Sequence, residues 1–280
     1  SNMLKTTPIT PALGGLVHEV DLSSPISDEL FEALHAALLR YQVLVIPGQP
    51  ISDEAHLDLA RRFGPLSIHP VSAASGKNET MEWIEDGPDS PPKATQWHAD
   101  LSWLPAPPKI ALLCAQELPE CGGDTMWMSL KAAYESLSQP MKDRLEGLVA
   151  VHDAGANFFV QVEYAAGKQV ADKLRQRVQQ SAPHPLVVRH PETGEKSLCF
   201  SPPNVTEIVG LHPEESQMLI DFLRALVERP TFALRWQWTV GDLVIWDERT
   251  TLHVALPDHY PARRVVRRCT VDPEAPPRAA

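Results

Sequence analysis

The chain has 280 residues, 43% of them hydrophobic and 22% charged, which is the composition of an ordinary globular protein with a sizeable buried core. Its formal net charge of −11 argues against non-specific binding to nucleic acid or to anionic membranes. The sequence contains no run of about 18 apolar residues, so it predicts no transmembrane helix, and no secretion signal is visible at its start. We therefore expect a cytoplasmic protein with neither nucleic acid nor membrane as a partner.

The four cysteines are widely spaced and form no Cys-x-x-Cys pair, which favours reduced thiols over a disulfide or a thiolate metal site. The prolines cluster in connections such as residues 88–92, which indicates many short elements joined by ordered turns. We expect a single domain over residues 4–272, a flexible tail over 273–280 and a cloning remnant at 1–3.

The N-terminal third of the chain mixes helix and strand. Helical patterns with N-cap signals run over residues 27–40 and 52–62, and the β-branched run at 43–46 predicts a buried strand between them. Residues 66–95 predict a long loop interrupted by one short strand around 81–84. Loops of this length inside a domain are usually functional or mobile.

Strand signals then recur at both ends of a long middle stretch, at residues 110–113, 125–127, 243–246 and 265–266. Helical patterns lie between them, at 130–148, 163–180 and 213–228. Because the strands do not alternate regularly with helices, a doubly wound parallel sheet is disfavoured. The sequence predicts a mixed α and β fold, namely a double-stranded β-helix (jelly-roll) core with flanking helices and a helical insert.

A candidate metal-binding pair lies in the segment Gln-Trp-His-Ala-Asp at residues 96–100. His98 and Asp100 lie in an extended segment, where residues two apart face the same side. A second His-x-Asp match, His56 and Asp58, lies in a predicted helix, where residues two apart point about 200° from each other, so that pair cannot share a metal. With one more imidazole, the first pair would form a ligand set that leaves other metal positions open for reactants.

The third ligand is not determined by spacing, because it must come from elsewhere in the fold. His253 has the best context, since it follows a strand that ends in Trp246 and precedes a cluster of arginines. His184 and His190 flank an apolar strand and are expected to cap it. Four further histidines lie in helical or turn contexts that are more typical of surface residues: His35, His152, His212 and His259.

The arginine cluster lies on a predicted strand and comprises Arg263, Arg264, Arg267 and Arg268. Period-two alternation places Arg264 and Arg268 on one face and the other two on the opposite face, but it does not say which face is inside. One face is expected to be solvated, with ion pairs to Asp258 or Glu248. The inward pair would bind carboxylates or sulfonates through bidentate, charge-assisted hydrogen bonds.

Residues 121–127 predict a turn that leads into a strand, with two glycines followed by Asp124 and Thr125. Gly-Gly-Asp is sufficient for a hairpin turn without any ligand. A buried Thr125 hydroxyl that faced an arginine-bound carboxylate would add a binding function to that turn.

With these pieces in place, the chain resembles the taurine dioxygenase family of Fe(II)/2-oxoglutarate oxygenases, which also contains phenoxyalkanoate dioxygenases and alkylsulfatases. The resemblance covers nearly the whole chain and keeps the motifs in the family's order. These motifs are residues 41–49, Arg62-Phe63-Gly64-Pro65, Trp97-His98-Ala99-Asp100, Gly122-Gly123-Asp124-Thr125, His190-Pro191-Glu192-Thr193-Gly194, Gly241-Asp242, Trp246-Asp247, His253, Arg264 and Arg268.

The resemblance implies a role for each matching residue. His98, Asp100 and His253 would be the catalytic iron ligands, and Thr125 and Arg264 would hold the distal carboxylate of 2-oxoglutarate. The primary substrate would meet three more residues: His69, Leu101 and Arg268. The implied reaction uses Fe(II), 2-oxoglutarate and O2, releases succinate and CO2, and hydroxylates a small organic anion. It would cleave a C–O or C–S bond where the attacked carbon bears oxygen or sulfur.

Four positions refine this expectation. Ala94 and Ser72 stand where taurine-cleaving members have the Asn and Tyr that hold the substrate's amine, which disfavours taurine. Glu248 stands where the family usually has Asn, with a role that the sequence leaves open. Asp100 is retained, which argues against a halogenase.

Two other classes of protein stay open at this point. One is a metal-binding jelly roll without oxygenase activity, such as a sensor or a degenerate relative, and the other is a zinc hydrolase that uses the same triad. The hydrolase leaves Arg264 and Thr125 without a role. Residues 71–93 are expected to form a lid over the substrate. The identity of the substrate and the number of copies in the assembly, a homo-oligomer included, are left open.

Overall fold

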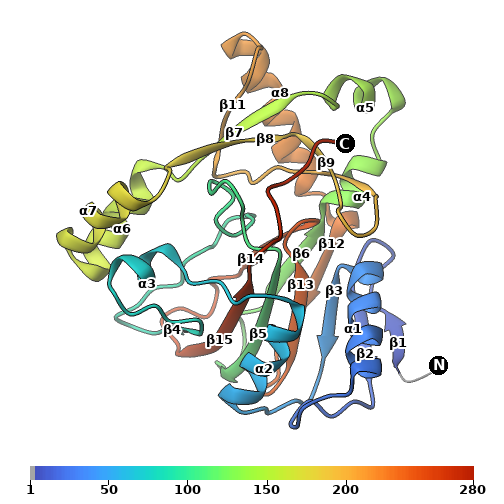
Figure 1. Ribbon diagram of the computed structural model, residues 1–280, viewed down its shortest axis with the longest axis vertical. Coiled ribbons are helices and arrows are strands. Elements are labelled where there is room, and N and C mark those ends of the chain that lie inside the picture. The colour runs from blue at the N-terminus through green and yellow to red at the C-terminus, as the bar shows by residue number, and fades with distance from the viewer. Residues whose placement is uncertain (1–3) are drawn as a thin grey trace.

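The computed structural model describes residues 4–280 (Figure 1). Its strands are β1 Lys5–Pro8, β2 Gly15–His18, β3 Val43–Ile46, β4 Glu82–Asp86, β5 Ile110–Glu117, β6 Thr125–Ser129, β7 Val149–Asp153, β8 Ser181–Pro185, β9 Val187–Arg189, β10 Lys196–Leu198, β11 Val205–Ile208, β12 Ala233–Trp236, β13 Leu243–Asp247, β14 Thr251–Ala255 and β15 Arg264–Val271. Its helices are α1 Asp28–Tyr41, α2 Asp53–Phe63, α3 Pro70–Ala74, α4 Leu130–Glu135, α5 Gln139–Leu145, α6 Ala156–Ala166, α7 Lys168–Arg177 and α8 Pro213–Val227, with a 3-10 turn at Pro230–Phe232.

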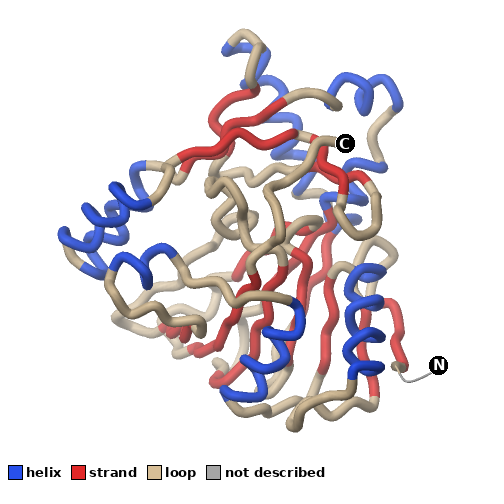
Figure 2. Tube along the Cα trace, viewed as in Figure 1, coloured by secondary structure: helices blue, strands red, loops and turns tan. Residues whose placement is uncertain are grey.

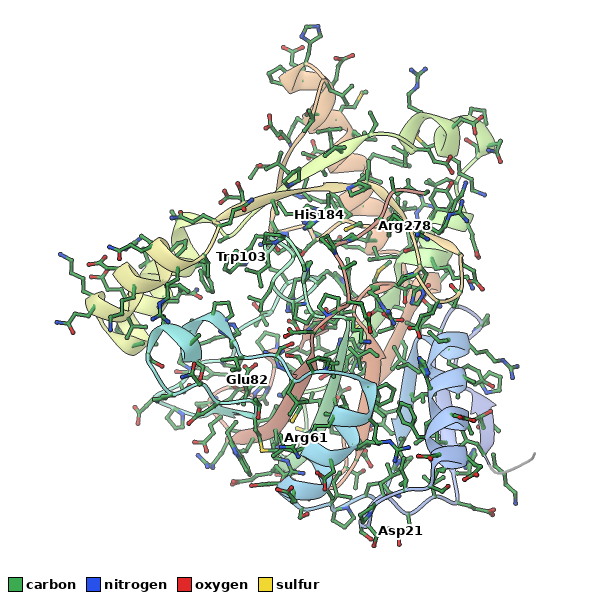
Figure 3. The ribbon with its side chains drawn as sticks, in the orientation of Figure 1. Asp21, Arg61, Glu82, Trp103, His184 and Arg278 are labelled. Carbon is green, nitrogen blue, oxygen red and sulfur yellow. The ribbon has the colours of Figure 1, made fainter. Side chains whose placement is uncertain are left out.

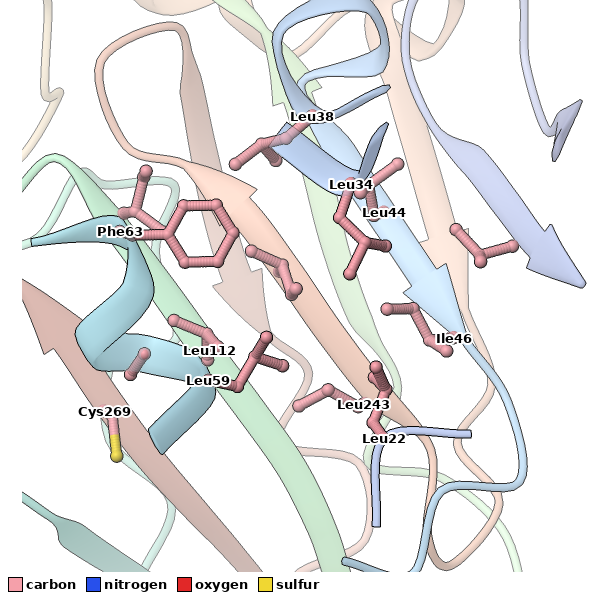
Figure 4. Close-up of a cluster of buried hydrophobic side chains, with 14 of the residues drawn as sticks. Leu22, Leu34, Leu38, Leu44, Ile46, Leu59, Phe63, Leu112, Leu243 and Cys269 are labelled. Carbon is pink, nitrogen blue, oxygen red and sulfur yellow. The ribbon is translucent and has the colours of Figure 1, made fainter. Parts of the chain in front are cut away.

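The largest sheet has seven strands in the order β1-β2-β3-β13-β5-β15-β4. All neighbours in it are antiparallel except β2 and β3. One face of this sheet packs against α1 and α2, where alternate strand residues such as Leu44, Leu112 and Leu243 meet helix residues such as Leu34 and Leu59 (Figure 4). Since the opposite face is also covered, β3 and β13 are buried along their whole length, as the β-branched run at 43–46 predicts.

The opposite face packs against a second, three-stranded sheet with the order β12-β6-β14. Between the two sheets lies an apolar layer to which Val45 and Trp246 contribute from the large sheet and Trp127 from the small one. This double-sheet core is the jelly roll that the sequence predicts. The predicted fold class is therefore confirmed.

The helical insert follows β6 and forms the upper part of the molecule in Figure 2. It contains a three-stranded sheet, β11-β7-β8, and the β9–β10 hairpin. Its own core joins Leu186, between β8 and β9, with Phe200, just after β10, and Leu223 of α8. The helices predicted at 130–148 and 163–180 are each divided in two, because Ser138 caps a new helix in the first and Gly167 separates α6 from α7 in the second.

The strand expected around 81–84 is present as β4, which pairs with β15. The loop expected over the rest of residues 66–95 also contains a short helix, because α3 begins at Pro70 with His69 as its N-cap. The tail expected to be flexible lies along β9, where the Arg189 N–H donates to the C=O of Arg278 and the Ala280 N–H donates to the C=O of Val187. Whether residues 71–93 close over a substrate stays a prediction. Among the described residues, no helix combines the length and the apolar character needed to cross a bilayer.

The core between the large sheet and its two helices generates a stability prediction. Leu112→Ala leaves a cavity in a fully buried site, so the free energy of unfolding should fall by about 2–5 kcal/mol. Met218→Ala, at a side chain that is 70% exposed, is the control and should change stability by less than about 0.5 kcal/mol. Urea unfolding followed by fluorescence measures both, and equal losses would contradict this description of the core.

Candidate active site

The structure brings His98, Asp100 and His253 together, although His253 follows His98 by 155 positions in the sequence. Asp100 Oδ1 lies 3.5 Å from His98 Nε2 and 3.4 Å from His253 Nε2. One potential ligand atom from each residue lies within 4.8 Å of the others, so the three side chains could bind one metal ion.

The backbone explains why these side chains converge. The His98 N–H donates to the C=O of His253 at 3.1 Å, and the His253 N–H donates back at 2.9 Å. His253 lies on β14 directly opposite Trp127 of β6, which is part of the apolar layer between the sheets. Residues paired directly across a ladder share a face. The imidazole of His253 therefore points into the jelly roll.

Both imidazoles are in a form that suits metal binding. His98 Nδ1 lies 2.7 Å from the C=O of Gln96, and since a carbonyl only accepts, Nδ1 carries the proton and Nε2 keeps its lone pair. Burial lowers the pKa of His253 to about 4, against the opposing effect of the Asp100 carboxylate, so this ring is neutral near pH 7. A neutral imidazole is the species that ligates metals.

Asp100 is held ionised by a neighbouring cation. Burial alone would raise the pKa of this carboxyl, but the Arg268 guanidinium and His253 lower it well below its usual range. Arg268 Nη1 donates to Asp100 Oδ2 at 3.2 Å, and Nη2 donates to Glu82 Oε2 at 3.1 Å. Arg268 Nε is buried and has no hydrogen-bond partner among the described residues.

The turn at Gly123 and Thr125 lies beside Arg264. Arg264 Nε donates to the C=O of Gly123 at 3.0 Å and Nη2 donates to Thr125 Oγ1 at 3.3 Å, while Trp238 Nε1 donates to the same hydroxyl at 2.9 Å. Gly123 has a φ of 75°, and a Cβ there would lie 3.0 Å from Arg264 Cδ. Burial lowers the pKa of Arg264, and no carboxylate of residues 4–280 forms an ion pair with it within 4.0 Å. This guanidinium is therefore available to an anion.

One face of β15 points inward with Arg264 and Arg268, and the opposite face is more buried than expected. Val266 belongs to the layer between the sheets, so Arg264 and Arg268 point into the jelly roll. The opposite face is not simply solvated, because α2 packs on it: Arg267 is 2% exposed and donates to His56 Nδ1 at 2.9 Å and to the C=O of Ile51 at 3.0 Å. Arg263 is exposed and pairs with Glu117, so the expected partners Asp258 and Glu248 were wrong.

The two remaining candidates lie at the edge of this site. His69 caps α3, with Nδ1 accepting the Val71 N–H at 3.1 Å. Burial lowers the pKa of His69, and the charges of Glu82, Arg268 and Asp100 all act on it. Leu101 follows Asp100 directly, is half-buried and has a φ of 51°, in the left-handed region.

Two acidic residues at the site were not assigned by sequence reasoning. Glu82 is the cross-strand partner of Arg268, and only the β4–β15 register reveals this. Glu248, whose role the sequence left open, is buried and accepts hydrogen bonds from the Asp100 N–H and from Trp246 Nε1. Burial and the Asp100 carboxylate raise the pKa of Glu248 well above its usual range.

Several of the other histidines are more buried than their local sequence predicts. His152 lies on β7 and His259 in a turn, yet both are buried, bonded to Ser102 and Asp86 respectively, so the expectation of surface positions was wrong for these two. His190 lies 2.8 Å from Asp247 in a buried ion network.

A cavity of about 190 Å³ lies between the jelly roll and the insert. Asp100 and Glu248 contribute to its wall, together with His184 and Arg278, which Figure 3 labels. Asp100 is the residue of the triad that lines this cavity.

The fold is a jelly roll, and His98, Asp100 and His253 give it a two-histidine, one-carboxylate site. A family model described as "Taurine catabolism dioxygenase TauD, TfdA family" matches residues 5–270. The chain therefore belongs to this family of 2-oxoglutarate-dependent dioxygenases, as its motifs predicted.

Individual relatives agree with this assignment. The chain is 34% identical over 281 residues to an alkylsulfatase of Acinetobacter baylyi, covering 97% of this chain and 86% of that one. It is 31% identical to an alpha-ketoglutarate-dependent sulfate ester dioxygenase of Pseudomonas putida, covering 98% and 91%. The crystal structure of AAD-2 with Mn(II) and N-oxalylglycine superimposes with a TM-score of 0.79 at 26% identity, covering 98% of both chains. Fe(II), 2-oxoglutarate and O2, the cofactors expected from the sequence, are those of this family.

The buried histidines outside the triad predict a pH dependence of stability. Burial lowers the pKa of His56 to about 4 and of His152 to about 3, whereas the ordinary value is 6.5. Below pH 6.5 the unfolded chain therefore binds protons that the folded chain does not, so stability is fully present above pH 6.5 and falls as the pH approaches 4. Urea unfolding of the metal-free protein between pH 7.5 and 4.5 measures this fall.

His56→Gln should make the fall shallower, while His212→Gln, at an exposed position, should leave it unchanged. A free energy of unfolding that stays constant from pH 7.5 to 4.5 would contradict the assignment of neutral buried rings.

Proposed function

We propose that this dioxygenase binds Fe(II) through His98, Asp100 and His253 and acts on a small organic anion. The observation that carries the proposal is the triad itself: two imidazoles and one carboxylate whose ligand atoms lie within 4.8 Å of one another. The His98 proton lies on Nδ1, so Nε2 is available to the metal. When bound, Fe(II) with 2-oxoglutarate supplies the O2-dependent oxidation that hydroxylates the substrate and yields succinate and CO2.

We assign Arg264 and Thr125 to the distal carboxylate of 2-oxoglutarate. Arg264 is buried, has no acidic partner and is aimed by the C=O of Gly123, so it is preorganised for a bidentate contact. The Thr125 hydroxyl accepts from both Arg264 and Trp238, which leaves its own proton to donate to a carboxylate oxygen.

Arg268, His69 and Leu101 are our candidates for contact with the primary substrate. The guanidinium of Arg268 already pairs with Asp100 and Glu82, and its Nε is the donor left without a partner. We favour sulfate esters, sulfonates or carboxylates as substrates, because the relatives reported above include an alkylsulfatase and a sulfate ester dioxygenase.

Taurine is a less suitable substrate on the same reasoning. The Ser72 hydroxyl accepts the Glu79 N–H at 2.9 Å, and Ala94 offers only a methyl group, so neither position supplies the amine-binding side chains of taurine-cleaving members. A zinc hydrolase gains no support, since it gives Arg264 and Thr125 no role. A jelly roll without oxygenase activity is not favoured either, since one of the relatives reported above is named a dioxygenase.

We treat residues 4–272 as one domain and place the protein in the cytoplasm. The number of copies in its assembly is left open, a homo-oligomer included. All four cysteines are unpaired, and two of them, Cys114 and Cys269, are buried. Free thiols of this kind are typical of reducing compartments.

His98→Ala tests the ligand assignment. Anaerobic titration of the wild-type protein with Fe(II) and 2-oxoglutarate should give the weak visible charge-transfer band of the chelate, and the variant should lose it because one of three ligands is removed. His212→Ala, at an exposed histidine, is the control and should keep the band. An unchanged band in the His98 variant would remove His98 from the metal site.

Arg264→Lys tests the co-substrate assignment. A point-like ammonium cannot reproduce the fork of a guanidinium, so the Kd for 2-oxoglutarate should rise roughly 10- to 150-fold, which corresponds to a charge-assisted hydrogen bond of about 1.5–3 kcal/mol. Arg263→Lys, at the exposed arginine that directly precedes β15, is the matched control and should bind normally. Isothermal titration with the Mn(II)-loaded protein gives both values, and equal affinities would contradict the assignment.

A further inference from the structure

Glu248 lies in the turn between β13 and β14, next to the candidate metal ligands. Its side chain is 2% exposed. Both carboxyl oxygens accept hydrogen bonds: Oε1 accepts from Trp246 Nε1 at 2.8 Å, and Oε2 accepts from the backbone N–H of Asp100 at 3.0 Å. Both donors are neutral groups.

This placement is unfavourable for stability. Within residues 4–280 no lysine or arginine forms an ion pair with Glu248, and the one cationic candidate within 4.0 Å is His253, whose Nδ1 lies 3.8 Å from Oε1. Burying an acid without a cationic partner costs folding free energy. Fold stability therefore does not account for a glutamate at this position.

Glu248 is instead connected to two of the three candidate ligands. Through Oε2 it holds the backbone of Asp100. Through Oε1 it holds the indole of Trp246, whose ring lies 5.1 Å from the ring of His253. His253 Nδ1 is itself buried and has no hydrogen-bond partner among the described residues. Glu248 Oε1 lies 3.8 Å from this nitrogen, beyond hydrogen-bond distance.

We propose that Glu248 is a positioning residue of the metal site, which fixes the Asp100 backbone and the Trp246 ring that lies beside the His253 ring. Groups that hold metal ligands from behind orient those ligands and tune the affinity for the metal. The inference rests on the proposed function, because it assumes that the triad binds the metal.

The chemistry of the two hydrogen bonds explains why a carboxyl group is required. A glutamine has one acceptor oxygen, so its NH2 group would face either the Trp246 N–H or the Asp100 N–H, donor against donor. The asparagine that the family usually carries at this position has the same limitation and is one methylene shorter. The double acceptor is thus a feature of this chain.

Glu248→Gln tests the proposal with a readout that does not depend on turnover. We would measure the Kd for Co(II) and for Fe(II) with 2-oxoglutarate under anaerobic conditions, together with the visible ligand-field spectrum of the Co(II) protein. Loss of an outer partner should weaken metal binding about 10- to 100-fold. It should also shift the Co(II) bands, because the Asp100 backbone and the His253 ring are no longer fixed.

Asp247→Asn is the matched control. Asp247 is the adjacent acid, is equally buried and undergoes the same change, but it bonds to His190 and Arg249, neither of which is a candidate ligand. This variant should lower the Tm of the metal-free protein while leaving the Co(II) spectrum and the Kd as in the wild type. A purely structural role for Glu248 would make the two variants behave alike.

Two further variants keep the test decisive. If Glu248→Gln does not fold, Trp246→Phe keeps the ring but removes the indole donor, and it should still shift the Co(II) spectrum. Wild-type affinity and spectrum in either folded variant would overturn the proposal. His98→Ala separates this failure from failure of the proposed function. If His98→Ala abolishes metal binding while Glu248→Gln does not affect it, only the role of Glu248 is wrong.

Discussion

Two backbone hydrogen bonds join His98 to His253, and the rest of the candidate active site depends on them. They attach the irregular segment at residues 96–100 to β14, which the small sheet holds against the large one. Without this bridge the carboxylate of Asp100 would have no reason to lie within 3.5 Å of two imidazoles from distant parts of the chain. The jelly roll therefore forms the site by pairing the segment at residues 96–100 with β14.

The charges around this bridge are arranged in a consistent way. Asp100 is ionised because Arg268 donates to it through Nη1, and Nη2 of the same guanidinium pairs with Glu82 on β4. Arg264, four residues earlier on the same face of β15, has no such acidic partner. Two arginines with the same orientation are thus chemically different: one is already balanced by carboxylates, and the other is free for an incoming dianion.

Sequence reasoning located the triad because its signals are local. The two-residue spacing of His98 and Asp100 in an extended segment is meaningful by itself, and helix geometry eliminates His56 and Asp58. The buried strand at 43–46 and the jelly-roll class were also predictable, since strand runs and their grouping along the chain are visible in the sequence.

What the sequence could not reveal depends on contacts between distant residues. The alternation along β15 did not show its inward face; the family resemblance assigned that face to Arg264 and Arg268, and the place of Val266 between the sheets agrees. The partners of Arg267 come from α2, more than two hundred residues earlier. Glu82 lies in the strand predicted around 81–84, but its pairing with Arg268 depends on the β4–β15 register, which the sequence does not show. His152 and His259 were expected at the surface because burial by a folded insert or a returning turn leaves no local pattern.

The central claim is that one metal ion is held by His98, Asp100 and His253. Its most direct test is an anaerobic crystal structure of the Mn(II) complex with N-oxalylglycine, with an anomalous difference map recorded for manganese. The account predicts a single strong peak bonded to His98 Nε2, a carboxylate oxygen of Asp100 and His253 Nε2, with the inhibitor's far carboxylate on Arg264. A peak bound by other residues, or an inhibitor carboxylate that does not contact Arg264, would contradict it.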